Sequence, residues 1–224
     1  MIVLKKVTLI CAVGTLAACS SASDPAPAFT PAISGSAANP AGVYSVTQNG
    51  VTRMQTGGGG SVGSALRFWG GGGGTNKAYA YESADVLVIS GMEAGSNATY
   101  AGLTGTAASS VPTSGVAAYV GEFTGTYYRG GAINGPWNVN GNLTTNVDFG
   151  SGLLAGNGTG DASSTLSVSG TISGTNFNGV ALFDAIDTSG PAVVPMTGGF
   201  YGTNTLAGIY QGTSVSGLFY GIAP

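Results

Sequence analysis

The chain has 224 residues, of which 41 are glycine and only 7% are charged, and its formal net charge is −3. Ordinary domains are about 25% charged and about 7% glycine. Glycine has no three-residue period, which excludes collagen, and no long window with helical spacing follows residue 20, which argues against an all-helical fold. Short runs of alternating apolar and polar residues between glycine-rich turns instead predict an all-β protein.

Residues 1–18 are predicted to be a lipoprotein signal peptide, with two lysines before a short apolar run. That run, over residues 7–13, is too short to cross a bilayer core of about 30 Å. The sequence Leu-Ala-Ala-Cys that ends at Cys19 resembles the bacterial lipobox, which implies cleavage between Ala18 and Cys19 and acylation of the Cys19 thiol. The alternative is an ordinary secretory signal with a cysteine after its cleavage site.

Cleavage would leave Cys19 as the one cysteine of the mature chain, because Cys11 lies in the segment that is removed. It would also remove two of the six Lys and Arg residues and keep nine Asp and Glu, giving a formal charge of −5 that disfavours nucleic acid as a partner. Several acyl chains on Cys19 would hold the protein in a membrane permanently. Ser20 in place of an aspartate favours the outer membrane, on its surface or its periplasmic face.

Residues 19–41 are rich in serine, alanine and proline and are predicted to form a flexible tether. Residues 42–110 are predicted to form a smaller β-rich subdomain, in which Asp-Val-Leu-Val-Ile over 85–89 is the most apolar run. Its predicted strands cover residues 43–54, 65–69, 77–81 and 84–90. The polar stretch over 109–115 contains a proline and no periodicity, and it predicts the boundary to the next domain.

Residues 116–224 are predicted to form an antiparallel eight-stranded β-barrel. Leu143, Thr145 and Val147 alternate with polar neighbours, as expected of strands with one buried face. Eight strands close into a barrel whose interior is just wide enough for side chains. The predicted strands cover residues 116–128, 139–149, 152–157, 164–173, 176–183, 194–202, 206–212 and 215–222.

The order of several motifs in this half resembles the barrel of transferrin-binding-protein-B-like surface lipoproteins. These motifs are Phe-Thr-Gly-Thr-Tyr-Tyr over 123–128, the segments 143–152 and 166–177, and Gly-Phe-Tyr-Gly-Thr-Asn over 199–204. The resemblance covers residues 116–221 and implies a handle subdomain before the barrel. Ligands in that family include transferrin, haemoglobin and complement factor H. Thr203 replaces the proline of the family's turn, and no ligand-contacting residue matches, so the resemblance assigns no specific ligand.

No catalytic residue, cofactor or metal site is predicted. The chain has no histidine, the commonest general base and metal ligand. Asp184 and Asp187 share one loop, and the alternatives for this pair are a weak calcium site and turn residues whose carboxylates bond their own backbone, of which the second is the more common. We therefore expect a protein that is not an enzyme.

Arg129 and Trp137 flank the loop over 130–136 and are the candidate partner contacts, because exposed aromatic residues beside arginine are typical binding anchors. In the alternative interpretation, Tyr127 and Tyr128 cap the barrel core and only Arg129 and Trp137 face water.

The sequence leaves three hypotheses for function. The first is a lipid-anchored outer-membrane protein that binds a host protein, a nutrient protein or a small solute through its loops. The second is a structural or adhesin-like envelope lipoprotein without a specific ligand. The third is an integral eight-stranded outer-membrane protein, which is disfavoured because Gly, Thr and Ser interrupt the apolar strand faces that lipid contact requires.

Overall fold

The computed structural model describes residues 35–40, 42–56, 59–70, 75–128, 135–186 and 190–224. Within these ranges the regular elements are sixteen β-strands and one 3-10 segment, η1 (Asp161–Ser163). The prediction of an all-β protein is confirmed. The described residues include no helix with the length and apolar character needed to cross a membrane.

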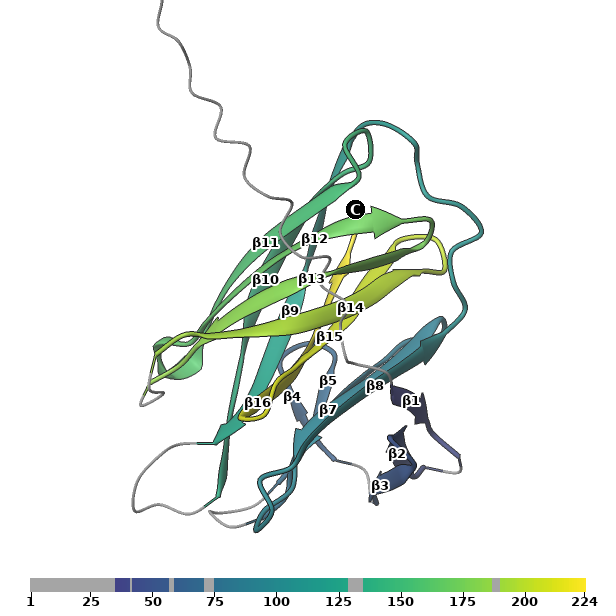
Figure 1. Ribbon diagram of the computed structural model, residues 1–224. Helices are drawn as coiled ribbons and strands as arrows, with labels where there is room; N and C mark the ends of the chain where they lie inside the picture. The colour runs from purple at the N-terminus through teal and green to yellow at the C-terminus, as the bar shows by residue number, and fades with distance from the viewer. Residues whose placement is uncertain (1–34, 41, 57–58, 71–74, 129–134, 187–189) are drawn as a thin grey trace, which may run out of the picture.

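Eight strands of the C-terminal half form a closed antiparallel barrel (Figure 1), which confirms the predicted architecture. The last strand closes the barrel by pairing with the first, with Phe219 opposite Phe123. Each predicted strand overlaps an observed one. The observed strands are β9 (Val116–Tyr128), β10 (Pro136–Asp148), β11 (Leu153–Gly160), β12 (Thr165–Ser173), β13 (Asn176–Asp184), β14 (Ala192–Tyr201), β15 (Thr205–Gln211) and β16 (Val215–Ile222).

Large apolar side chains fill the barrel interior, as expected for eight strands. Phe123, Phe177, Phe183 and Phe219 are each fully buried there, together with Tyr210. Glycines on the inner face make room for these rings. These side chains form one continuous core along the barrel axis.

Two smaller sheets precede the barrel (Figure 1). The five-stranded sheet packs on the outer side of β15, β16 and β9, where the rings of Tyr81 and Tyr220 stack with centroids 3.8 Å apart. Because this sheet covers part of the outer barrel surface, the alternative of an integral membrane barrel is further disfavoured. The five strands are β4 (Gly60–Val62), β5 (Leu66–Trp69), β6 (Lys77–Glu82), β7 (Val86–Met92) and β8 (Thr99–Gly105).

The other small sheet corrects two predictions. The single strand predicted over 43–54 is a hairpin of β2 (Tyr44–Gln48) and β3 (Val51–Gln55). Asn49 and Gly50 turn the chain with φ values of 52° and 76°, the positive angles that an Asn-Gly hairpin turn requires. The prediction missed this dipeptide signal and so joined the two strands.

Strand β1 (Gly35–Ala38) lies inside the segment that was predicted to be tether. It adds to the free edge of β2, and Ala37 is buried. At Gly35 an added Cβ would lie only 2.0 Å from the carbonyl oxygen of Ala101, so the close approach of β1 to β8 depends on the absence of a side chain. Small residues that resemble a linker in the sequence are therefore packing residues here.

Candidate binding surfaces

Several predicted site residues lie outside the described residues. These are Ala18 and Cys19 at the predicted cleavage and lipidation site, Arg129 of the candidate partner contacts, and Asp187 of the acidic pair. Trp137 and Asp184 are described. Among the described residues, no group of three or more His, Cys, Asp or Glu side chains could hold a metal ion.

Trp137 stands near the start of β10, directly opposite Tyr127 on β9. Its side chain is half-buried and packs against the barrel core, so only part of the ring is exposed to solvent. Tyr127 is buried, with its ring centroid 5.6 Å from that of Phe183, while Tyr128 is half-buried. Tyr127 therefore caps the core, as the alternative interpretation predicted, and Trp137 does so in part while keeping an exposed surface.

The framework around Trp137 is braced by hydrogen bonds to other elements. The Asn138 Nδ2 donates to Tyr79 Oη on β6 at 2.8 Å, and the Tyr128 N–H donates to the Ser214 carbonyl at 2.9 Å. Burial raises the pKa of Tyr79 well above its ordinary value, so its hydroxyl stays protonated at neutral pH. Because three separate parts of the chain meet here, this end of the barrel is a fixed platform rather than an isolated hairpin.

An exposed aliphatic side chain lies close to this platform. Ile186 is 54% exposed, and its carbonyl accepts a hydrogen bond from Tyr127 Oη at 3.4 Å. Trp137 and Ile186 together give the barrel end an apolar character, which suits contact with a protein surface better than contact with an ion. No periodicity in the sequence indicates Ile186, because this residue follows the end of β13.

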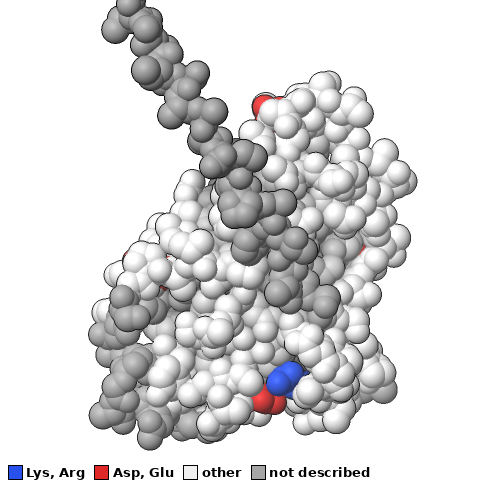
Figure 2. All heavy atoms as spheres, in the orientation of Figure 1, with Lys and Arg blue, Asp and Glu red and all other residues white. Residues whose placement is uncertain are grey.

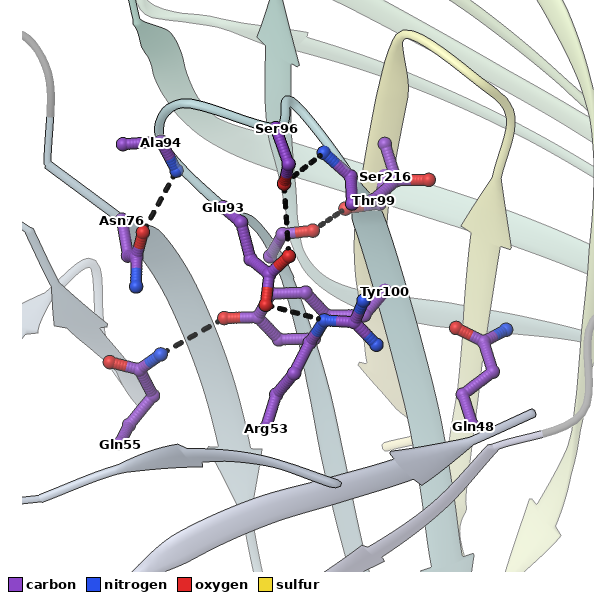
Figure 3. A network of polar contacts seen from close by, with 12 residues as sticks. Gln48, Arg53, Gln55, Asn76, Glu93, Ala94, Ser96, Thr99, Tyr100 and Ser216 are labelled. Carbon is purple, nitrogen blue, oxygen red and sulfur yellow. Dashed lines mark hydrogen bonds and ion pairs between the residues drawn. The ribbon is translucent and has the colours of Figure 1, made fainter. Parts of the chain in front are cut away.

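A polar network joins the three sheets (Figure 3). Arg53 on β3 forms an ion pair of 3.0 Å with Glu93, and its guanidinium lies 5.4 Å from the ring centroid of Tyr100. Gln55 donates to the Tyr100 hydroxyl at 3.0 Å, and burial raises the pKa of that hydroxyl to about 12. This part of the network holds the β1–β3 sheet against the β4–β8 sheet.

The same network continues into the barrel. Ser216 on β16 donates from Oγ to the Gly91 carbonyl at 2.6 Å, and Thr99 donates from Oγ1 to the Gly212 carbonyl at 2.7 Å. Gln48 of β2 donates to Gln211 of β15 at 2.8 Å. The small sheets are thus fixed to the barrel by directional bonds as well as by apolar packing.

Glu122 forms a second connection between the β4–β8 sheet and the barrel, which the sequence analysis missed. It is 9% exposed, and its carboxylate accepts hydrogen bonds from the Ser64 N–H at 2.8 Å and from Tyr220 Oη at 2.7 Å. Burial, together with the neighbouring carboxylate, raises the pKa of Tyr220 well above its ordinary value. A carboxylate in the middle of a strand, in a chain with so few charges, is the feature of the sequence that could have indicated a covered surface.

The face of the molecule drawn in Figure 2 carries very few charges, with Lys, Arg, Asp and Glu confined to a few spots among the described atoms. A surface of this kind has little electrostatic field with which to attract a charged ligand. The described part of this face is therefore composed mainly of uncharged residues.

Comparison with known proteins supports the architecture. The family model described as the C-lobe and N-lobe beta barrels of Tf-binding protein B matches residues 111–222, half of the chain. A crystal structure of transferrin-binding protein B from serogroup B Neisseria meningitidis is similar with a TM-score of 0.55 and 19% identity, over 80% of this chain and 39% of that one. No curated protein sequence matches the chain.

Two further solved structures are similar. A surface lipoprotein aligns with a TM-score of 0.50 and 16% identity over 63% of this chain and 77% of its own. A variant of transferrin-binding protein B from Haemophilus parasuis aligns with a TM-score of 0.50 and 18% identity over 82% of this chain and 41% of its own. The chain thus spans about two fifths of the two transferrin-binding proteins. It belongs to the family of C-lobe and N-lobe β-barrels of transferrin-binding protein B.

Proposed function

We propose that this protein is a non-catalytic outer-membrane lipoprotein, anchored through Cys19, that binds a protein partner at the barrel end that carries Trp137. The observation that carries the proposal is the apolar surface that Trp137 and Ile186 form at one end of the barrel. The barrel itself belongs to the family of transferrin-binding protein B barrels. Half-exposed aromatic side chains held on a rigid framework lose little conformational entropy when they bind a partner.

The hydrogen-bonded framework supports this proposal. Asn138 and Tyr128 fix the β9–β10 hairpin to β6 and to the β15–β16 turn, so the platform is ordered before a partner arrives. Preorganisation of this kind lowers the cost of association. The absence of histidine from the sequence argues for binding rather than acid–base chemistry.

Two of the similar structures are transferrin-binding proteins, which makes transferrin the first protein to test. Binding of transferrin to the full-length protein in outer-membrane vesicles can be measured by surface plasmon resonance. Replacing Trp137 with alanine should weaken binding by about tenfold or more, the usual effect of removing an aromatic anchor. Val116→Ala at the start of β9 is the matched control, since Val116 is 81% exposed and lies at the other end of β9 from Tyr127, the residue opposite Trp137.

Equal weakening by both substitutions, or no binding by the wild-type protein, would contradict the proposal of a transferrin-type partner at this end. A protein that is anchored but captures no partner in a pull-down from host fluids would instead have a structural role in the envelope.

The proposed location is tested by protease treatment of intact cells that carry the wild-type protein or Cys19→Ala. Release of the wild type by external protease, together with loss of the variant from the envelope, supports surface display through the lipid. Protection of the wild type until the outer membrane is opened would exclude a receptor for a large external protein.

A further inference from the structure

A groove of about 450 Å³ lies where the barrel meets the small sheets. Residues of β13, β14 and β15 line it on the barrel side, and residues of β1 and β8 line it on the other side. Neither Trp137 nor Ile186 is among the lining residues, so this groove is separate from the platform. Its volume falls within the range of about 300–1,000 Å³ that is typical of sites for small ligands.

Tyr201, at the end of β14, is the most deeply buried polar side chain of the lining, with 6% of its surface exposed. Its ring packs against β8, because a Cβ added at Gly105 would lie 2.8 Å from the ring atom Cδ1. Its hydroxyl lies over the preceding part of its own strand, because a Cβ added at Gly199 would lie 3.3 Å from Oη. The side chain is therefore held between β8 and β14 with its hydroxyl directed along the groove.

The Tyr201 hydroxyl has no hydrogen-bond partner among the residues that the structure describes. Burial by itself raises the pKa of this hydroxyl to about 12, with no hydrogen bond contributing, so the group is neutral at pH 7. A buried hydroxyl without a partner is costly, because it has lost water and gained nothing in return. A ligand in the groove can supply the missing hydrogen bond.

A second polar group lies beside this hydroxyl. The Asn176 Oδ1 is also 3.3 Å from the position that a Cβ would take at Gly199, and Asn176 lines the groove. Since Gly199 has no side chain, the amide and the hydroxyl border a position that is left open. The Thr197 hydroxyl lines the same wall and donates to Asn178 Oδ1 at 2.8 Å, so its oxygen can still accept a hydrogen bond.

The polar groups of the lining share one property, which is that each can both donate and accept a hydrogen bond. Tyrosine, threonine and serine hydroxyls and the asparagine amide all do so, and the lining residues include no charged side chain. A carboxylate or phosphate only accepts and an ammonium group only donates, and either would be poorly solvated here without an opposite charge. The lining therefore selects for an uncharged ligand that carries hydroxyl groups.

The apolar part of the lining narrows the class of ligand further. Leu103 of β8 and Ile209 of β15 line the groove together with the Tyr201 ring. A sugar ring has this combination of surfaces, because its hydroxyl groups project from its edge while its faces carry C–H groups. A neutral sugar can bond to the Tyr201 and Asn176 groups and place a C–H face against the aliphatic side chains.

We propose that this groove is a binding site for a neutral sugar residue, with the Tyr201 hydroxyl and the Asn176 amide as its main hydrogen-bonding groups. Both groups stand on adjacent paired strands, since Asn176 of β13 pairs with Gly199 of β14. The site is thus ordered before the ligand arrives, which lowers the cost of binding. It adds a second recognition surface to the protein, independent of the partner proposed for the Trp137 end.

A glycan array probed with the full-length protein in detergent tests the site. The array carries neutral, sialylated and sulfated oligosaccharides of animal and bacterial types, so the bound members also identify the source of the sugar. We expect binding to neutral members in preference to charged ones. The affinity for a bound neutral member is then measured by isothermal titration calorimetry for the wild type and for each variant.

Tyr201→Phe removes one oxygen that has no bond within the described protein, so it should weaken sugar binding by about tenfold and leave the melting temperature unchanged. Tyr119→Phe is the matched control, because Tyr119 is a buried tyrosine of the barrel core that does not line the groove. Asn176→Ala should also weaken binding, whereas Asn142→Ala, at an exposed position on the outer face of β10, should not.

Three results would overturn the proposal. These are an array without bound neutral glycans, a preference for charged glycans, and an affinity that Tyr201→Phe does not change. Trp137→Ala separates this site from the proposed protein-binding platform, because it should weaken protein binding and leave sugar binding unchanged. Loss of sugar binding in Trp137→Ala would place the sugar at the platform and would also refute the site at Tyr201.

Discussion

Replacing Glu122 with alanine should destabilise the barrel and the β4–β8 sheet together. The carboxylate accepts two hydrogen bonds in a covered position, one from the Ser64 N–H at 2.8 Å and one from Tyr220 Oη at 2.7 Å. Alanine leaves the Ser64 N–H without this acceptor, and the Tyr220 hydroxyl keeps only the Ser64 Oγ, 3.2 Å away, as a partner. Solvent reaches this position only poorly, because Glu122 is 9% exposed. The substitution thus removes one polar connection between two sheets and keeps the apolar contacts around it.

The expected magnitude follows from these two bonds. A buried donor that loses its acceptor costs about 1–3 kcal/mol, which applies in full to the Ser64 N–H. The Tyr220 hydroxyl adds a smaller cost, because it can donate to the Ser64 Oγ instead. Removing a carboxylate from a poorly solvated position regains part of that cost. We therefore expect the free energy of unfolding to fall by about 2–3 kcal/mol for Glu122→Ala, and by about 1 kcal/mol for Glu122→Gln, which keeps one acceptor oxygen.

The two tryptophans of the chain allow each part to be observed separately. Trp69 lies on β5 of the small sheet and Trp137 on β10 of the barrel. Glu122→Ala is combined with Trp137→Phe or with Trp69→Phe, and urea unfolding is followed by tryptophan fluorescence. The first variant then reports unfolding of the small sheet through Trp69, and the second reports unfolding of the barrel through Trp137. If the sheet and the barrel unfold as one unit, Glu122→Ala lowers both midpoints equally.

A shift in the Trp69 transition alone would refute this reasoning, because it would show that the small sheet detaches before the barrel unfolds. Unchanged midpoints in both backgrounds would show that the carboxylate contributes nothing. Asn157→Ala is the control, since it is an exposed residue in the barrel wall and should change stability by no more than about 0.5 kcal/mol.

Three other substitutions or conditions test the packing. Phe123→Ala in the barrel core should cost about 3–5 kcal/mol in urea unfolding, and a loss below about 1 kcal/mol would contradict the filled interior. Gly217→Ala should lower the free energy of unfolding by about 1–3 kcal/mol or more in the same assay. The added Cβ would lie 2.1 Å from the Thr124 carbonyl oxygen and 2.2 Å from the Tyr210 ring, and a neutral effect would contradict this close approach. Burial raises the pKa of Tyr100 from 10.0 to about 12, so its folded form stays neutral while the unfolded chain ionises. Stability should therefore fall as the pH rises from 10 toward 12, by up to about 1.4 kcal/mol per pH unit for this residue, and a constant urea midpoint over that range would contradict its burial.

The eight barrel strands could be predicted from the sequence because their information is local. Alternation such as Leu143, Thr144 and Thr145 fixes which side chains face inward, and glycine-rich turns mark the ends of each strand. The run over 85–89 predicted β7 for the same reason, since most of its residues are apolar and every residue of that strand is buried. Closure of the barrel followed from the number of strands.

Elements that form only through contact with a distant part of the chain were harder to predict from the sequence. Gly35–Ala38 forms a strand because β2 offers a free edge and β8 offers a close surface, and neither is visible in four small residues. Trp137 lies near the start of β10, but the sequence did not show that its ring packs on the barrel core.

The sequence by itself determined the all-β class, the number of barrel strands and the low charge, because each depends on residue type and on spacing over a few positions; the lipid anchor rests on the sequence as a prediction. The tertiary structure alone decided which outer barrel surface is covered and which is open. Glu122 and Val116 both point outward from β9, yet Glu122 lies beneath the β4–β5 turn while Val116 is 81% exposed. Alternation assigns a side chain to a face of a strand, whereas burial of that face depends on contacts between residues far apart in the chain.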